Sequence, residues 1–180
     1  MEFKKIQLNG FKSFAEKTNF LIEDGLTGIV GPNGCGKSNI VESLRWAMGE
    51  TSAKSMRGSG MEDVIFNGTS NKASKNIAEV SIVVDNASHE GPFQYKEMDQ
   101  IEIRRKIEKD KGSKFYINDK EVRARDAQMF FADLSTGAHS PSMISQGRIG
   151  ALVTAKPTDR RAILEEAANI SGLHVRRHEA

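Results

Sequence analysis

The chain has 180 residues, of which 38% are hydrophobic and 28% are charged, and its formal net charge is +2. This length suits one globular domain with a buried core, and no apolar run is long enough to span a bilayer. The N-terminus lacks the apolar segment of a secretion signal, and a single cysteine excludes an internal disulfide framework and suits a reducing cytosol. The net charge is too small to indicate nucleic-acid binding by itself, so that inference depends on where the charges lie.

The first fifty residues are predicted to form three short strands and a helix. Residues 3–8 and 18–22 are the first two strands, separated by the turn sequence GFKSF. Residues 26–30 form a compact apolar run bounded by glycines, which is typical of a buried strand. A helix is expected over residues 37–48, where apolar side chains recur every three or four positions until Gly49 ends the pattern.

The middle of the chain is predicted to be rich in strands. Residues 50–76 contain many Ser, Gly, Lys and Asn residues and are interpreted mostly as loop. Apolar residues alternate with polar ones over 78–84 and again over 101–107, as in half-buried strands. A turn at 110–112 and the segment 114–117 indicate that the second of these strands continues into a hairpin.

Two helices are predicted after the hairpin. A tight turn at Asn118 and Asp119 is expected to lead into a helix that holds Met129, Phe130 and Leu134. A last helix should begin at residues 157–159, with a threonine or aspartate cap, and a polar helical pattern resumes at 174–180 without a capping residue. The pattern therefore predicts a helix that continues beyond residue 180.

The most specific motif is GPNGCGKS at residues 31–38, a full match to the pattern G-x-x-x-x-G-K-[ST]. Its glycines let several backbone N–H groups converge on phosphate oxygens, and the following helix directs its positive end at the same anion. The pattern predicts a nucleotide bound with Mg²⁺, with the lysine on the β- and γ-phosphates and the serine hydroxyl on the metal, and by itself it permits a kinase, a GTPase or a transport-type ATPase. The residues expected to bind the nucleotide are Gly31, Pro32, Asn33, Gly34, Cys35, Gly36, Lys37, Ser38 and Asn39.

The cysteine of this motif has two interpretations. Cys35 can serve as a small residue within the loop, or as a thiol that the helix end and Lys37 activate.

Other classes of P-loop protein fit less well. A GTPase requires the string N-K-x-D, and the nearest match, at residues 71–74, lacks the aspartate. A small-molecule kinase requires an arginine-bearing lid, whereas the arginine pairs of this chain lie in or beside predicted strands.

Six sequence strings together resemble the structural maintenance of chromosomes (SMC) family, the ABC ATPases of condensin and cohesin, and especially its bacterial members. The strings are GFKSF (10–14), GPNGCGKSNI (31–40), MRGSGMEDVIF (56–66), FYIN (115–118), MISQGRI (143–149) and RRAILEEAA (160–168). The resemblance implies an α/β fold of the P-loop class, namely the N-terminal lobe of an ABC-type ATPase head with a mixed sheet and a β-rich subregion. It implies that residues 1–172 form this lobe and that residues 173–180 begin a coiled-coil arm.

The resemblance also implies roles for individual residues. Gln146 matches the glutamine that binds Mg²⁺ and senses the γ-phosphate and the attacking water, and Arg57 matches an arginine near the nucleotide that links DNA contact to hydrolysis. Together with Lys37, these are the expected catalytic residues. Lys12 and Ser13 match residues near the base and the phosphates. The alternative explanation for Gln146 is a polar loop residue, and that for Arg57 is a solvated arginine. For Lys12 and Ser13 the alternative is an exposed turn.

Two strings imitate motifs that an ABC head carries elsewhere. Residues 81–85 end in an aspartate like a Walker B strand, but no catalytic glutamate follows, so we interpret them as a sheet strand. Residues 134–137 lack the second paired glycine of the signature L-S-G-G. In the family both motifs belong to a C-terminal lobe beyond a long coiled coil. We therefore expect this chain alone to bind nucleotide weakly and to hydrolyse it poorly.

Basic residues are concentrated in the predicted hairpin. Nine Lys or Arg residues against four Asp or Glu lie between residues 104 and 125. Such a hairpin can follow a phosphate backbone, and Lys114, Arg123 and Arg125 are the DNA-binding residues that we expect, whereas a solvated sheet face is the alternative. The resemblance implies double-stranded DNA, a second SMC protomer, the C-terminal lobe, and kleisin and winged-helix subunits as partners, at the nucleoid in the cytoplasm.

The function that we expect is that of the ATP-binding lobe of a DNA-associated ATPase that drives chromosome condensation and segregation through ATP-dependent head engagement. A related coiled-coil DNA-repair ATPase and a stand-alone nucleotide-binding module without hydrolysis are the alternatives. For a lobe of a larger head we further expect an open sheet edge and poor solubility in isolation.

Overall fold

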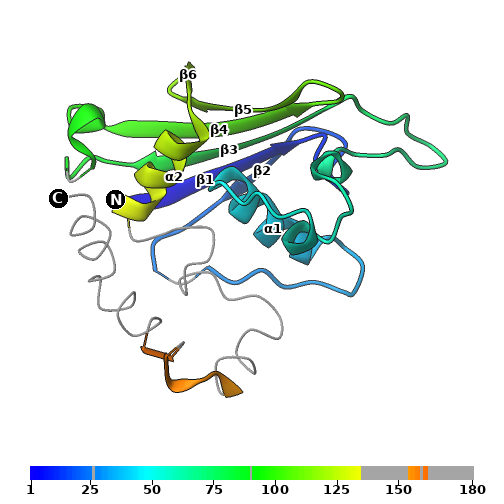
Figure 1. Ribbon diagram of the computed structural model, residues 1–180, viewed down its shortest axis with the longest axis horizontal. Coiled ribbons are helices and arrows are strands. Elements are labelled where there is room, and N and C mark those ends of the chain that lie inside the picture. Colours follow the sequence, from blue (N-terminus) through cyan, green and yellow to red (C-terminus); the bar gives the residue numbers. More distant parts are fainter. Residues whose placement is uncertain (26, 90, 135–153, 159, 162–180) are drawn as a thin grey trace.

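A single sheet of six strands, in the order β2-β1-β3-β4-β5-β6, organises the described part of the chain (Figure 1). All pairings between these strands are antiparallel, so the expected mixed sheet has antiparallel pairs only in this part. The structure, a computed structural model, describes residues 1–25, 27–89, 91–134, 154–158 and 160–161. The strands are β1 (Glu2–Asn9), β2 (Thr18–Leu21), β3 (Ile77–Asp85), β4 (Gln100–Glu108), β5 (Gly112–Ile117) and β6 (Lys120–Val122).

Both α-helices lie on the same face of the sheet (Figure 1). Trp46 of the first helix and Phe131 of the second are fully buried together with alternate residues of the central strands, such as Ile82 and Ile103. The hydrophobic core therefore lies between this face and the helices. The helical segments are α1 (Lys37–Ala47), α2 (Ala124–Asp133) and the short 3₁₀ turns η1 (Lys54–Met56), η2 (Met61–Val64) and η3 (Phe93–Tyr95). No helix among the described residues has the length and apolar character needed to cross a membrane.

Most predicted elements are present close to their predicted bounds. The strands predicted at 3–8, 18–22, 78–84 and 101–107 correspond to β1, β2, β3 and β4, and the helix predicted at 37–48 corresponds to α1. Their periodicity was informative because the side chains on one face of each element are less exposed than those on the other.

The strand predicted at residues 26–30 is wrong. Residues 27–30 have no regular structure, and the side chains of Ile29 and Val30 are 42% and 92% exposed. A strand forms only where a neighbour pairs with its N–H and C=O groups, and β2, at the edge of the sheet, is paired only with β1 among the described residues. The apolar residues of this segment therefore remain uncovered here.

The segment after the β4–β5 hairpin also differs from the prediction. Asn118 and Asp119 do form a tight turn, both with positive φ, but the turn connects β5 to the short strand β6 before α2 begins. Three residues carry too little periodicity to reveal a strand. The predicted helix from 157 onward and the segment 173–180 lie almost entirely outside the described residues, so the domain division there stays a prediction.

An arginine at a core position fixes α1 to the sheet. Arg105 of β4 is only 3% exposed, and its Nη1 donates to the carbonyls of Trp46 and Glu50 at 2.7 Å each. The guanidinium lies between the rings of Trp46 and Phe115, 4.6 Å from each centroid, and also contacts the Ser113 hydroxyl. Burial lowers the pKa of Arg105 to about 10, so the group remains charged at neutral pH. Because α1 begins at the P-loop, the contacts of Arg105 fix the orientation of the helix that follows the P-loop.

Candidate nucleotide-binding site

The loop at residues 31–36 leads directly into α1 and leaves the N-terminal end of that helix accessible. Gly34 and Gly36 have φ values of 82° and 94°, and Gly36 is the N-cap residue. A Cβ on Gly36 would lie 2.9 Å from the hydroxyl of Ser13, so this position lacks room as well as a permissible backbone for a side chain. The first turn of α1 holds no acidic residue, which leaves the positive end of the helix un-neutralised. The arrangement is that of an anion-binding loop.

The side chain of Lys37 folds back onto its own loop. Its Nζ donates to the carbonyls of Gly31 and Pro32 at 2.6 Å each and lies 3.9 Å from the Sγ of Cys35. These acceptors are neutral, so a phosphate group would compete with them effectively for the ammonium. Ser38 and Cys35 are exposed beside it.

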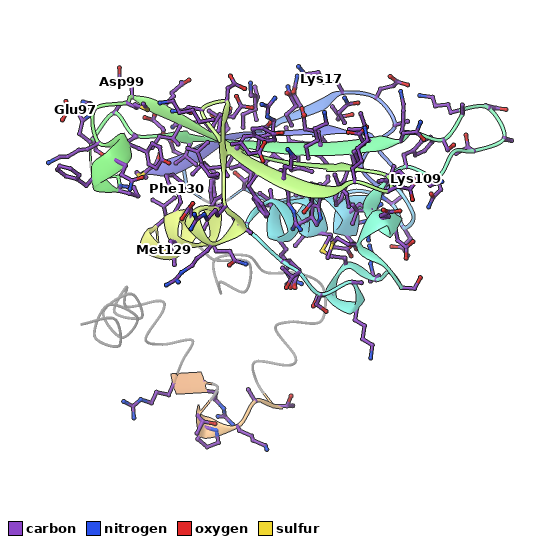
Figure 2. The ribbon with its side chains drawn as sticks, turned by 45° about the horizontal axis from the view of Figure 1, so that its top comes forward. Lys17, Glu97, Asp99, Lys109, Met129 and Phe130 are labelled. Atoms are coloured by element: carbon purple, nitrogen blue, oxygen red, sulfur yellow. The ribbon has the colours of Figure 1, made fainter. Side chains whose placement is uncertain are left out.

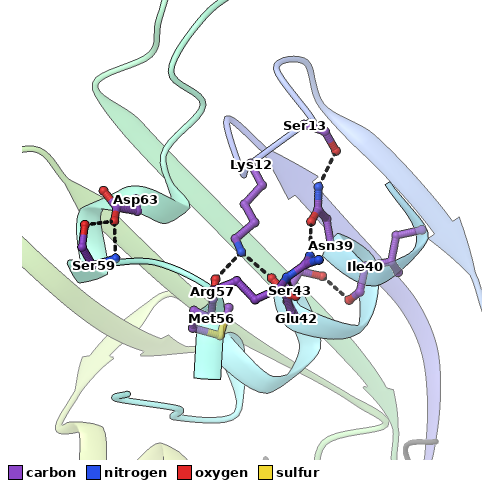
Figure 3. Close-up of polar contacts among 10 residues, drawn as sticks. All are labelled: Lys12, Ser13, Asn39, Ile40, Glu42, Ser43, Met56, Arg57, Ser59 and Asp63. Carbon is purple, nitrogen blue, oxygen red and sulfur yellow. Dashed lines mark hydrogen bonds and ion pairs between the residues drawn. The ribbon is translucent and has the colours of Figure 1, made fainter. Parts of the chain in front are cut away.

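A buried carboxylate lies next to this loop and contacts two cations (Figure 3). The side chain of Glu42, on α1, is 8% exposed, and its Oε2 pairs with the ammonium of Lys12 while its Oε1 pairs with the Nε of Arg57. Lys12 also donates to the carbonyl of Met56. Three segments that are far apart in the sequence therefore meet at one side chain.

Asn39 connects this ion cluster to the P-loop. Its Oδ1 accepts from the Nη2 of Arg57 at 2.8 Å, and its Nδ2 donates to the Ser13 hydroxyl at 2.8 Å (Figure 3). Ser13 in turn faces Gly36, the N-cap of α1. Hydrogen bonds thus run from Arg57 to the residue against which the phosphate loop packs.

The segment that carries Arg57 is held by an aspartate. Arg57 has a φ of 54° and is followed by a turn in which the Oδ2 of Asp63 accepts from the N–H of Ser59 at 2.6 Å, the Ser59 hydroxyl at 2.9 Å and the N–H of Gly60 at 3.0 Å (Figure 3). The hydrogen bond from Gly60, followed by those from Ser59, lowers the pKa of Asp63 below its ordinary value of 3.8.

The structure brings together four of the sequence-predicted site residues beside the P-loop. Lys12, Ser13, Asn39 and Arg57 form one network, whereas Gln146 lies outside the described residues. Sequence reasoning missed Glu42, which is buried on α1 but lies outside the apolar stripe of Ile40, Leu44 and Met48, so the local pattern gave no signal for it. Residues 81–85 belong to strand β3, as interpreted, and the signature-like string at 134–137 lies outside the described residues except for its first residue.

The expected DNA-binding residues do not share one surface. The Nζ of Lys114, on β5, lies 3.0 Å from the Oε2 of Glu121, and this hydrogen bond raises the pKa of the lysine. Lys114 is next to Lys106 in the register, on the sheet face opposite to the buried Arg105. Arg123 and Arg125 are exposed at the start of α2, which packs on the other face (Figure 1). The hairpin is also less basic at its surface than its composition indicates, because Arg105 is buried.

The residues present fit a nucleoside triphosphate with Mg²⁺. The glycine-lined loop, the ammonium of Lys37 and the exposed hydroxyl of Ser38 supply donors for phosphate and one oxygen ligand. Within the described residues no group of three or more His, Cys, Asp or Glu side chains could hold a metal ion on its own. A magnesium ion here would therefore take most of its ligands from the phosphates and water, as Mg²⁺ commonly does.

The sheet, the helix packed on it and the glycine-rich loop at the start of that helix define the chain as a P-loop nucleotide-binding lobe. Residues 2–148 match the sequence profile described as "RecF/RecN/SMC N terminal domain". The chain belongs to this family, and both the resemblance and the fold class predicted from the sequence are confirmed.

Individual relatives agree with this assignment. Over all 180 residues the chain is 58% identical to the chromosome partition protein Smc of Cereibacter sphaeroides, of which it spans 16% of the length. A solved structure described as "Structural biochemistry of ATP-driven dimerization and DNA stimulated activation of SMC ATPases" matches 93% of this chain and 99% of its own, with a TM-score of 0.79 and 28% identity. An "SmcHead bound to the C-winged helix domain of ScpA" matches 92% of this chain and 51% of its own, with a TM-score of 0.83 and 30% identity.

Proposed function

We propose that this chain is the ATP-binding lobe of an SMC-type ATPase head that organises chromosomes. The observation that carries the proposal is the P-loop at the start of α1, with Lys37 and the Arg57–Asn39–Ser13 network beside it. The chromosome partition proteins to which the chain is similar support the biological role. The name of these relatives also favours chromosome partition over DNA repair, although the matched family includes RecF and RecN.

The residues of the chain take the following roles in this proposal. The loop N–H groups and Lys37 hold the β- and γ-phosphates, and Ser38 and Gln146 bind the Mg²⁺ that neutralises phosphate charge when it is present. Arg57 supplies a further positive charge near the nucleotide. None of these residues can polarise the attacking water as a catalytic glutamate does, so hydrolysis requires a C-terminal lobe and the signature loop of a second head.

The partners follow from the same proposal. A second protomer engages the nucleotide face, and the C-terminal lobe of the head covers the open edge at β2 and the exposed residues 27–30. Two similar structures, described as showing "ATP-driven dimerization" and an SMC head "bound to the C-winged helix domain of ScpA", support a second head and a kleisin winged-helix subunit as partners. DNA contact places the protein at the nucleoid in the cytoplasm.

Reconstitution with the missing lobe tests this function. We expect the chain alone to hydrolyse ATP negligibly, and a mixture with a C-terminal head segment that carries the signature motif and Walker B to hydrolyse it measurably. Lys37→Ala in the mixture should abolish that activity, whereas the exposed Lys17→Ala should leave it unchanged. Full turnover by the chain alone would contradict the proposal, and would favour an enzyme that is complete within these residues.

A further inference from the structure

We propose that Glu42 is a positioning residue of the nucleotide site, because its two oxygens hold Lys12 and Arg57 in place beside the P-loop. The inference rests on the proposed function and adds a residue to it. Glu42 contacts no loop residue of the P-loop motif directly. Glu42 acts through the two cations, because it ties both of them to α1, the helix that follows the P-loop (Figure 3).

The exposed fractions of the three side chains support this role. The side chains of Glu42 and Lys12 are 8% and 12% exposed, whereas that of Arg57 is 56% exposed. A solvent-exposed arginine samples many rotamers, and fixing it costs conformational entropy at the moment of binding. Here the Nε of Arg57 is fixed on Glu42 and its Nη2 on Asn39, so this cost is met before a ligand arrives. The remaining nitrogen, Nη1, has no partner among the described residues and is available to an anion.

The charges explain why a carboxylate is needed at this position. Lys12 and Arg57 meet at Glu42, in the middle of α1, where two uncompensated cations would repel each other. The carboxylate of Glu42 lies between the two cations and offsets their repulsion, and Asp63 adds a second negative charge near Lys12. A glutamine would keep the size and one acceptor oxygen, but its amide group would direct N–H donors at one of the two cations.

Binding of Mg-ATP to the Glu42→Gln variant tests the proposal. We expect the Kd to rise about tenfold, since both Lys12 and Arg57 lose their charged partner. In a chain that already carries Lys12→Ala and Arg57→Ala, the same substitution should change the Kd less than twofold, because there is no cation left to position. The matched control is Glu97→Gln. The Glu97 carboxylate is exposed and lies before β4, at the end of the sheet opposite to Lys109 (Figure 2), so this substitution should leave the Kd unchanged.

A spectroscopic measurement separates this proposal from the proposed function. In ¹⁵N NMR spectra without nucleotide, the guanidinium N–H groups of Arg57 should give protected, slowly exchanging signals that Glu42→Gln removes and Glu97→Gln leaves in place. A wild-type chain that shows these signals but binds no Mg-ATP would contradict the proposed function and leave the positioning of Arg57 by Glu42 intact. Equal losses of affinity in the wild-type and double-alanine backgrounds, or an unprotected Arg57 signal in the wild type, would overturn the positioning role.

Discussion

Gly10 and Gly112 share a left-handed backbone but differ in what surrounds them. Gly10, in the turn sequence GFKSF, has a φ of 63°, and a Cβ there would lie 2.2 Å from the backbone oxygen of Ile77 at the start of β3. Gly112 has a φ of 79°, and a Cβ there would meet nothing within 4 Å. The first glycine is therefore required by both conformation and space, and the second by conformation alone.

Alanine substitutions at these two positions should have different costs. Gly112→Ala is expected to lower the free energy of unfolding by about 1–2 kcal/mol, the cost of a left-handed alanine. Gly10→Ala should lower it by at least about 3 kcal/mol, because backbone of β3 must also move. Urea denaturation followed by circular dichroism measures both values. Equal losses would show that the close approach to Ile77 carries no energy.

At the scale of elements, a buried charge joins α1 to the sheet. The guanidinium of Arg105 satisfies the carbonyl of Trp46 in the last turn of α1 and that of Glu50 just after the helix. Its neighbour Arg104 lies on the other face, over the Tyr116 ring and 2.7 Å from Asp119. Arg105→Met should destabilise the fold by about 3 kcal/mol, because two buried carbonyls lose a charged donor. Arg104→Met should cost less than about 1 kcal/mol, as for exposed pairs. Thermal and urea unfolding of the two variants provide the comparison, and similar losses would refute the anchoring role of Arg105.

The turn after Arg57 should respond to acid. Because hydrogen bonds lower the pKa of Asp63 in the folded state, the stability that its ionised form contributes is present above its ordinary value of 3.8 and is lost as the pH falls through the lowered pKa. Asp63→Asn should therefore destabilise the chain near pH 6, and the difference from the wild type should shrink below pH 3.8. Urea unfolding between pH 3 and pH 6 measures this difference, with Asp110→Asn as an exposed control. A difference that stays constant with pH would exclude the charge as the cause.

Much of this fold could be predicted because its elements each bury one face. The alternation of β3 and β4 and the apolar stripe of α1 follow directly from that asymmetry. Residues 26–30 could not be predicted correctly, since a strand also requires a partner that the local sequence does not specify. Arg105 sat within a correctly predicted alternation, but nothing local indicated that its charge would be buried between two aromatic rings.

The site could be predicted in its parts but not in its connections. The P-loop is contiguous, and its spacing is specific enough to reveal its chemistry. Lys12 and Arg57 emerged only through family resemblance, because their contact with α1 is made across the tertiary fold. Glu42 was missed since its role depends on two residues that are distant in the sequence, and the role of Gln146 stays a prediction.

At the scale of the whole molecule, the expected DNA contacts lie on two faces. Lys114 is paired with Glu121 on the face of the sheet that lies away from α1 and α2, which we call the open face. Arg123 and Arg125 lie at the start of α2, on the face that the helices cover. DNA that follows one face of the sheet can contact Lys114 or the arginine pair, but not both. Only one of the two variants, Lys114→Ala or Arg123→Ala/Arg125→Ala, should therefore make the dependence of the logarithm of the DNA-binding constant on the logarithm of the salt concentration less steep. The expected change is about 0.9 per lost phosphate contact. If the open face is the one used, Glu121→Gln should increase the affinity by freeing Lys114. Slopes that no variant alters would exclude these residues from the DNA contact.

Calorimetric titration of the folded chain with Mg-ATP, beside the Lys37→Ala variant, tests the nucleotide site most directly. The ammonium of Lys37, now held by the carbonyls of Gly31 and Pro32, should transfer to the phosphates. We predict saturable binding of Mg-ATP by the wild-type chain, and at least about a tenfold weaker Kd for the variant, which corresponds to about 1.4 kcal/mol. Absence of binding by a wild-type chain shown to be folded, or equal affinities of the two proteins, would contradict the assignment of this loop as a nucleotide site.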